Sequence, residues 1–136
     1  MRSVRTLVLI GTILTLAALA PITSASIARP FHVVKDCNPP TCVITSSSYR
    51  GIPAGSVINY SPNSDGTLTA VISVATGTAT GRCDLAPIFG DPSAPGHCVF
   101  ASGTGSLTQF HLDVWVGTAN FVTWTWDGTY SFGSGG

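Results

Sequence analysis

One pair of side chains in this sequence has the types and the spacing for acid–base chemistry. His111 and Asp113 lie two residues apart in the segment FHLDVWVG. If that segment is a β-strand, both side chains project from the same face. A carboxylate beside an imidazole can orient the ring for proton transfer, and the two groups together can bind a metal ion. The alternative is a solvated histidine and aspartate on the polar face of a strand, and this second arrangement is the one we expect.

Other signals for catalysis are absent from the sequence. It contains no G-x-S-x-G, H-E-x-x-H or phosphate-binding glycine motif and no glutamate, which leaves aspartate and histidine for acid–base work. An enzyme built from this chain, for example an isomerase or a hydrolase, would therefore use His111 with Asp113 or Asp127. We assign no catalytic residue, metal ligand or cofactor, and keep His111 and Asp113 as candidates only.

Alternation along two segments predicts where the tryptophans lie. In residues 110–117 the even positions are Phe, Leu, Val and Val, and the odd positions include His, Asp and Trp115. The following segment, FVTWTW, places Trp124 and Trp126 on one face. The connecting loop decides whether these two rings join the apolar face or lie beside His111 and Asp113. We favour the apolar register, because one buried face specifies strand register strongly.

The dipeptide Asp127-Gly128 predicts a further hairpin near the C-terminus. A three-residue loop, Trp126-Asp127-Gly128, with Gly128 at positive φ, would align the remaining aromatic residues on one face. Trp126 would then lie at the loop tip and be the most exposed of the three tryptophans. We therefore predict Trp126 and Trp115 as ligand-binding residues.

Four cysteines, Cys37, Cys42, Cys83 and Cys98, predict two disulfides in a short chain. Of the three possible pairings we favour Cys37–Cys42 with Cys83–Cys98, because neighbours along the chain meet most often. The second bridge would stabilise the fold by roughly 3 kcal/mol. Zinc binding is disfavoured, because no Cys-x-x-Cys pair occurs.

The rest of the chain has the composition of strands and turns. Thr, Val, Gly and Ser dominate, and no segment has a sustained helical period. In TLTAVISVAT, alternation places Leu68, Ala70, Ile72 and Val74 on one face. We predict an all-β fold of about seven to nine short strands, arranged as an antiparallel sandwich or a small barrel. The domain would span residues 29–132, followed by a flexible tail, 133–136.

The N-terminal segment has the pattern of a secretory signal peptide. Two arginines precede fifteen uncharged residues, TLVLIGTILTLAALA, and then small residues. We predict a signal peptide over residues 1–28, with cleavage after Ala25 or Ala28, and a secreted product. The apolar run is short for a span of the roughly 30 Å hydrocarbon core, and no later segment is long enough.

The net charge of the chain limits the classes of partner that it can bind. Without Arg2 and Arg5, four basic residues face six aspartates, a net charge of 4 − 6 = −2. Such a chain has no basic surface for nucleic acid. We expect a non-catalytic binding or accessory module whose aromatic surface takes a small molecule, a glycan or a protein. The small-barrel enzyme described above and a structural protein of the cell envelope are the alternatives.

The layout of a short exported β-domain with two small disulfide loops resembles that of secreted chromophore-carrying apoproteins of the neocarzinostatin type. No motif of that group is matched residue by residue, so the resemblance implies nothing for individual residues of this chain.

Overall fold

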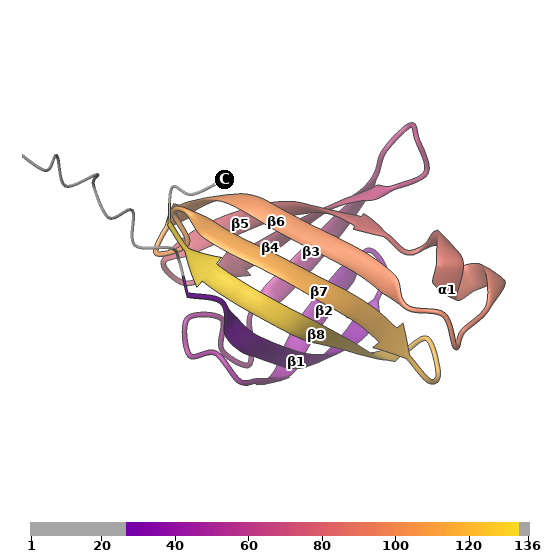
Figure 1. The fold of residues 1–136 in the computed structure, drawn as a ribbon. Helices are drawn as coiled ribbons and strands as arrows, with labels where there is room; N and C mark the ends of the chain where they lie inside the picture. Colours follow the sequence, from indigo (N-terminus) through magenta and orange to yellow (C-terminus); the bar gives the residue numbers. More distant parts are fainter. Residues whose placement is uncertain (1–26, 134–136) are drawn as a thin grey trace, which may run out of the picture.

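The computed structural model describes residues 27–133, which form a closed antiparallel β-barrel. Eight strands follow one another around the barrel in chain order, and the last pairs with the first to close it (Figure 1). A short helix lies between the fifth and sixth strands. The elements are β1 (Arg29–Asn38), β2 (Thr41–Ser47), β3 (Val57–Pro62), β4 (Leu68–Val74), β5 (Gly77–Asp84), α1 (Ala86–Gly90), β6 (Gly96–Gly105), β7 (Phe110–Thr118) and β8 (Thr123–Phe132).

The predicted all-β class is confirmed, and the barrel rather than the sandwich is formed. The sequence analysis did not predict α1, which lies in the Pro/Gly-rich connection and buries Ile88. The predicted signal peptide lies almost entirely outside the described residues, and so do residues 134–136 of the predicted tail. The backbone N–H of Gly133 donates to the carbonyl of Gln109, and its carbonyl oxygen is hydrogen-bonded to the ring of His111.

Both predicted disulfides are present, and each joins residues that face one another across a strand pair. Cys37 and Cys42 are partners in the β1–β2 ladder, and Cys83 and Cys98 are partners in the β5–β6 ladder. The bridges therefore tie neighbouring strands of the barrel at positions that the ladders already bring together.

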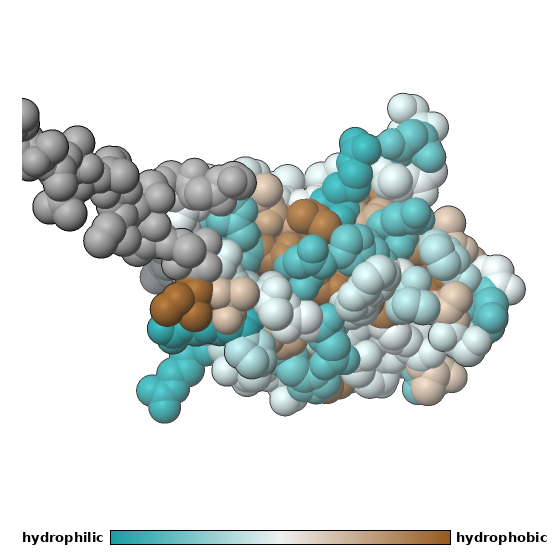
Figure 2. Space-filling view, viewed as in Figure 1, coloured by the Kyte–Doolittle hydropathy of each residue, from teal (hydrophilic) through white to brown (hydrophobic). Residues whose placement is uncertain are grey.

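Alternation fills the barrel interior as the sequence predicts for β4 and β7. Ala70 and Ile72 are buried with Leu68 and Val74 partly buried on the same side, and in β7 the even positions from Phe110 to Val116 are all buried. Trp126 is the β-partner of Val116, so the apolar register of the two tryptophans is confirmed. The odd positions of these two strands face the outer wall. Figure 2 shows the outer surface mainly in teal and pale tones, with hydrophobic residues in separate small areas.

The predicted hairpin at Asp127-Gly128 is wrong. β8 continues through this dipeptide for 10 residues and pairs along its length with both β7 and β1. The sequence TWTWDGTYSF alternates without a break: its even positions are Trp, Trp, Gly, Tyr and Phe, and its odd positions are Thr, Thr, Asp, Thr and Ser. A turn here would remove the β8 partner from half of β1 and half of β7. The hydrogen bonds that close the barrel therefore outweigh the local preference for a turn.

Gly128 meets a different requirement from the one predicted. It is not among the described glycines at positive φ, and its role is to allow two strands to approach closely. A Cβ atom at this position would lie 1.9 Å from the carbonyl oxygen of Asp113 on β7. Glycine inside a strand commonly marks such a close backbone approach in a barrel.

The two ends of the barrel differ. The β1–β2, β3–β4, β5–β6 and β7–β8 connections share one end, which carries α1 and is here called the α1 end (Figure 1). At the other end, loop residues Ile52 and Leu107 are fully buried. There the Tyr49 ring packs 4.3 Å from that of Tyr130 and also against Phe110. This aromatic plug fills the barrel at that end and leaves the α1 end as the place for a cavity.

Candidate functional site: a pocket at the α1 end

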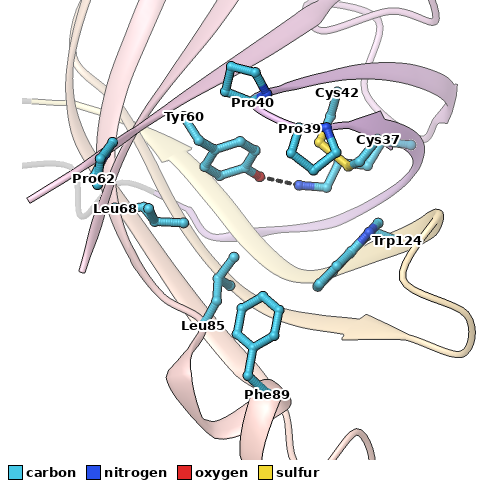
Figure 3. Close-up of a pocket in the computed structure, with 11 residues that line it drawn as sticks. Cys37, Pro39, Pro40, Cys42, Tyr60, Pro62, Leu68, Leu85, Phe89 and Trp124 are labelled. Atoms are coloured by element: carbon cyan, nitrogen blue, oxygen red, sulfur yellow. Dashed lines mark hydrogen bonds between the residues drawn. A yellow bond between two sulfur atoms is a disulfide. The ribbon is translucent and has the colours of Figure 1, made fainter. Parts of the chain in front are cut away.

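A pocket with a volume of about 310 Å³ opens into the barrel at the α1 end. Its wall consists almost wholly of apolar side chains and a disulfide, with one amine and one phenol at its floor (Figure 3). The lining residues are Lys35, Cys37, Pro39, Pro40, Cys42, Tyr60, Pro62, Leu68, Leu85, Phe89 and Trp124.

Each side of the pocket comes from a different local structure. The disulfide-closed β1–β2 hairpin carries Pro39 and Pro40 over one side. On the opposite side α1 and the residue before it supply Phe89 and Leu85 (Figure 3). Phe89 is 68% exposed, so it marks the mouth of the pocket. Trp124, near the start of β8, completes the wall and is buried.

Lys35 is the residue that distinguishes this pocket. It is the sole lysine of the chain, and it points into the barrel with 1% of its surface exposed. Strand alternation puts it there, because Phe31, Val33 and Lys35 share the inward face of β1. Its β-partner on β2 is Ile44, also buried.

The Lys35 amine lies among aromatic groups. Its Nζ is hydrogen-bonded to the hydroxyl of Tyr60, which reaches in from β3 (Figure 3). The same nitrogen lies 3.9 Å from the centroid of the Trp126 ring. A ring face attracts the charged form of an amine. These contacts hold the amine in place without supplying a negative charge.

Among residues 27–133, no carboxylate accompanies Lys35 inside the barrel. All six aspartates are exposed on the outer surface of the described chain, and the sequence has no glutamate. Burial therefore lowers the pKa of the Lys35 amine well below its usual value. Burial likewise raises the pKa of the Tyr60 phenol, so this group keeps its proton at neutral pH. The pocket floor is thus a neutral phenol beside an amine that burial favours in its neutral form.

The predicted candidates His111 and Asp113 lie outside this pocket, on the outer wall of the barrel, and are not paired with each other. The ring of His111 is bonded to the carbonyl of Gly133, while Asp113 accepts a hydrogen bond of 2.6 Å from His97 on β6. Asp127 pairs with His32 on β1. The structure therefore forms two His–Asp pairs across neighbouring strands, and neither includes His111.

The two tryptophans predicted to bind ligand lie in opposite environments. Trp115 is 55% exposed on the outer wall, where its ring stacks on that of His97 with centroids 4.5 Å apart. Trp126 has no exposed surface, so the prediction that it is the most exposed tryptophan is wrong. Its place in the middle of β8, facing inward opposite Val116 and Val33, is the reason. It reaches the pocket only through its contact with the amine of Lys35.

Sequence reasoning missed Lys35, Tyr60 and Phe89. For Lys35 a signal was available in the sequence. The residue stands at the alternate position after Phe31 and Val33, and the next alternate position is Cys37, a member of a predicted disulfide. A charged residue at an inward position of a strand is a departure from the usual pattern and points to a site. Phe89 lies on a helix too short to give a helical period.

Two further properties of the described residues bear on the site. They contain no cluster of three or more His, Cys, Asp or Glu side chains that could hold a metal ion. In residues 27–133 no helix has the length and apolar character needed to cross a membrane. Comparisons with protein-family models, with curated proteins and with solved structures gave no match for this chain.

Proposed function

We propose that the protein is a binding module for a small, largely apolar molecule that enters the pocket at the α1 end. The observation that supports this most directly is an apolar cavity with a buried, carboxylate-free amine at its floor. Small-molecule sites have this composition: mostly hydrophobic walls with a few polar groups that fix orientation. A ligand with one hydrogen-bonding end and an apolar body matches both parts of the pocket.

The size of the cavity limits the ligand. Its volume of about 310 Å³ is near the lower end of the usual range for ligand pockets. An apolar cavity of about 150 Å³ binds benzene. A molecule of about two fused rings, or a short chain of similar bulk, therefore suits this pocket better than a long lipid.

The enzyme alternative has less support. His111, Asp113 and Asp127 lie on the outer wall and do not line the pocket at the α1 end. Trp115 on the same wall keeps its proposed role as a surface contact for a flat ligand such as a sugar ring. Its convex setting buries less of a ligand than the pocket does.

Filling the pocket is expected to weaken binding of an apolar fluorescent naphthalene dye at least tenfold. Leu68→Trp places a larger side chain in the cavity wall, so less space remains for the dye. Val99→Trp is the matched control, because Val99 is 43% exposed on the outer wall of β6. Dissociation constants from dye emission test this. Equal affinities for Leu68→Trp and the unmodified protein would place the dye outside the pocket and contradict the proposal.

We further propose that the protein acts outside the cytoplasm, where its two disulfides are stable. Export with cleavage after Ala25 or Ala28 is expected to give a product that begins at Ser26 or Arg29. Intact-mass measurement of the secreted protein tests this, and alkylation without reductant should modify no cysteine. A product that retains residues 1–25, or one with four alkylated cysteines, would be the contrary result.

A further inference from the structure

We propose that the pocket takes a small apolar aldehyde and that Lys35 holds it covalently as an imine. This inference rests on the proposed function and deepens it, because it names the polar end of the ligand. Three features of the pocket floor support it: the buried amine, the adjoining phenol and the absence of any carboxylate or further basic side chain among the described lining residues.

The amine has the environment of a nucleophile. Lys35 is buried among Tyr60, Trp126 and apolar wall residues, and it lines the cavity that a ligand would enter. A buried lysine without a carboxylate partner reacts through its neutral form, which has a free electron pair. An amine kept only for structure gains nothing from this position, since a methionine or leucine would fill the same space without burying a polar group.

The number of donors favours a carbonyl group over a carboxylate. A carboxylate carries a full charge and about four acceptor sites. The floor offers it one amine and one phenol, and the three arginines in the described chain, Arg29, Arg50 and Arg82, are exposed elsewhere. A carboxylate that enters this apolar cavity would therefore lose more hydrogen bonds to water than the pocket floor can replace. The loss of hydration raises its free energy. The single oxygen of an aldehyde needs only two partners, which Lys35 and Tyr60 supply.

The exposure of Lys35 favours an aldehyde over a ketone. Only 1% of its surface is accessible, at the floor of the pocket. An unhindered carbonyl carbon at the end of a flat apolar body reaches such a nitrogen more readily than a branched one.

The step balances without an oxidant or a reductant. The electron pair of Nζ forms a bond to the carbonyl carbon, and the carbonyl oxygen takes one proton from the attacking nitrogen. The resulting carbinolamine loses its hydroxyl with the second nitrogen proton as water, and the C=N bond forms. The hydroxyl of Tyr60 is in contact with Nζ and can relay the proton in each step. It gives a proton to the oxygen of the ligand and takes one from Nζ in return.

The test uses 2-naphthaldehyde, with 2-naphthoate and 2-naphthylmethanol as probes of the same skeleton. After reduction with cyanoborohydride, intact mass is expected to show one naphthylmethyl group per chain, and peptide mapping is expected to place it at Lys35. Assignment is direct, because the N-terminal amine is the only other primary amine that the sequence provides. Excess 2-naphthylmethanol should suppress the label, which tests the pocket without altering the protein.

Two variants complete the test. Lys35→Met should lose the label at this position, while Val99→Thr on the outer wall should keep it. Tyr60→Phe should slow formation of the adduct at least tenfold and leave the final extent unchanged, which a merely structural role for Tyr60 would not do.

The outcomes separate the two proposals. If the aldehyde binds reversibly but reduction leaves Lys35 unmodified, the imine is overturned and the binding pocket stands. If 2-naphthoate binds more tightly than the aldehyde and depends on Lys35, the ligand is an anion and the imine is again overturned. If none of the three probes binds, the proposed function fails with the imine.

Discussion

Replacing Gly128 with alanine is expected to lower the free energy of unfolding by about 3 kcal/mol or more, toward the upper end for added volume in a packed core. The added Cβ would overlap the backbone of β7, at 1.9 Å from the Asp113 carbonyl oxygen and 2.8 Å from Val114 Cα. Backbone cannot rotate away as a side chain can. The two strands would have to separate where β8 also pairs with β1, so closure of the barrel itself is affected.

Gly117→Ala on β7 is the matched control. A Cβ there would meet the Thr125 hydroxyl at 3.3 Å, a side-chain atom that can move. We expect a change within about 1 kcal/mol. Urea unfolding followed by tryptophan fluorescence measures both variants. Equal stabilities for the two alanine variants would show that β7 and β8 do not approach closely at Gly128.

Lys35→Met is expected to remove a rise in stability with pH that the unmodified protein shows. The folded-state pKa of Lys35 lies well below the unfolded value of about 10.4. Between these two values the unfolded chain binds one more proton than the folded chain, so the free energy of unfolding increases with pH by up to about 1.4 kcal/mol per unit. Below the folded pKa both states are protonated and this slope disappears.

The measurement is chemical unfolding at several pH values from 7 to 9.5. This range avoids the opposing effect of Tyr60, whose raised pKa makes the folded state lose stability as the unfolded phenol ionises above about pH 10. Arg50→Met, which removes an exposed cation, is the control and should keep the slope. A slope that survives in Lys35→Met would mean that the amine is solvated and charged in the folded protein.

Much of the candidate site could not be predicted from the sequence, because it depends on how the sheet closes into a barrel. The hairpin error at Asp127-Gly128 shows why, because the local signal for a turn was genuine and the ten-residue alternation around it was stronger. The predicted turn placed Trp126 at a loop tip, and its predicted role in ligand binding followed from that error. The predicted His111–Asp113 pair is not formed for a related reason. Asp113 is hydrogen-bonded instead to His97 on the neighbouring strand, and residues that meet across strands are far apart in the sequence.

The sequence by itself determined the strand class, the inward face of β7, the core register of Trp124, and both disulfides. These features depend on period-two alternation and on short separations along the chain, which are local properties. The tertiary structure alone decided that the sheet closes, that β8 runs through Asp127-Gly128, and that one end is plugged by Tyr49 and its neighbours. It also decided that Lys35 meets Tyr60, a residue 25 positions away, at the floor of a cavity. Closure sets these features because each strand must satisfy two neighbours at once, and no single segment of the sequence records that requirement.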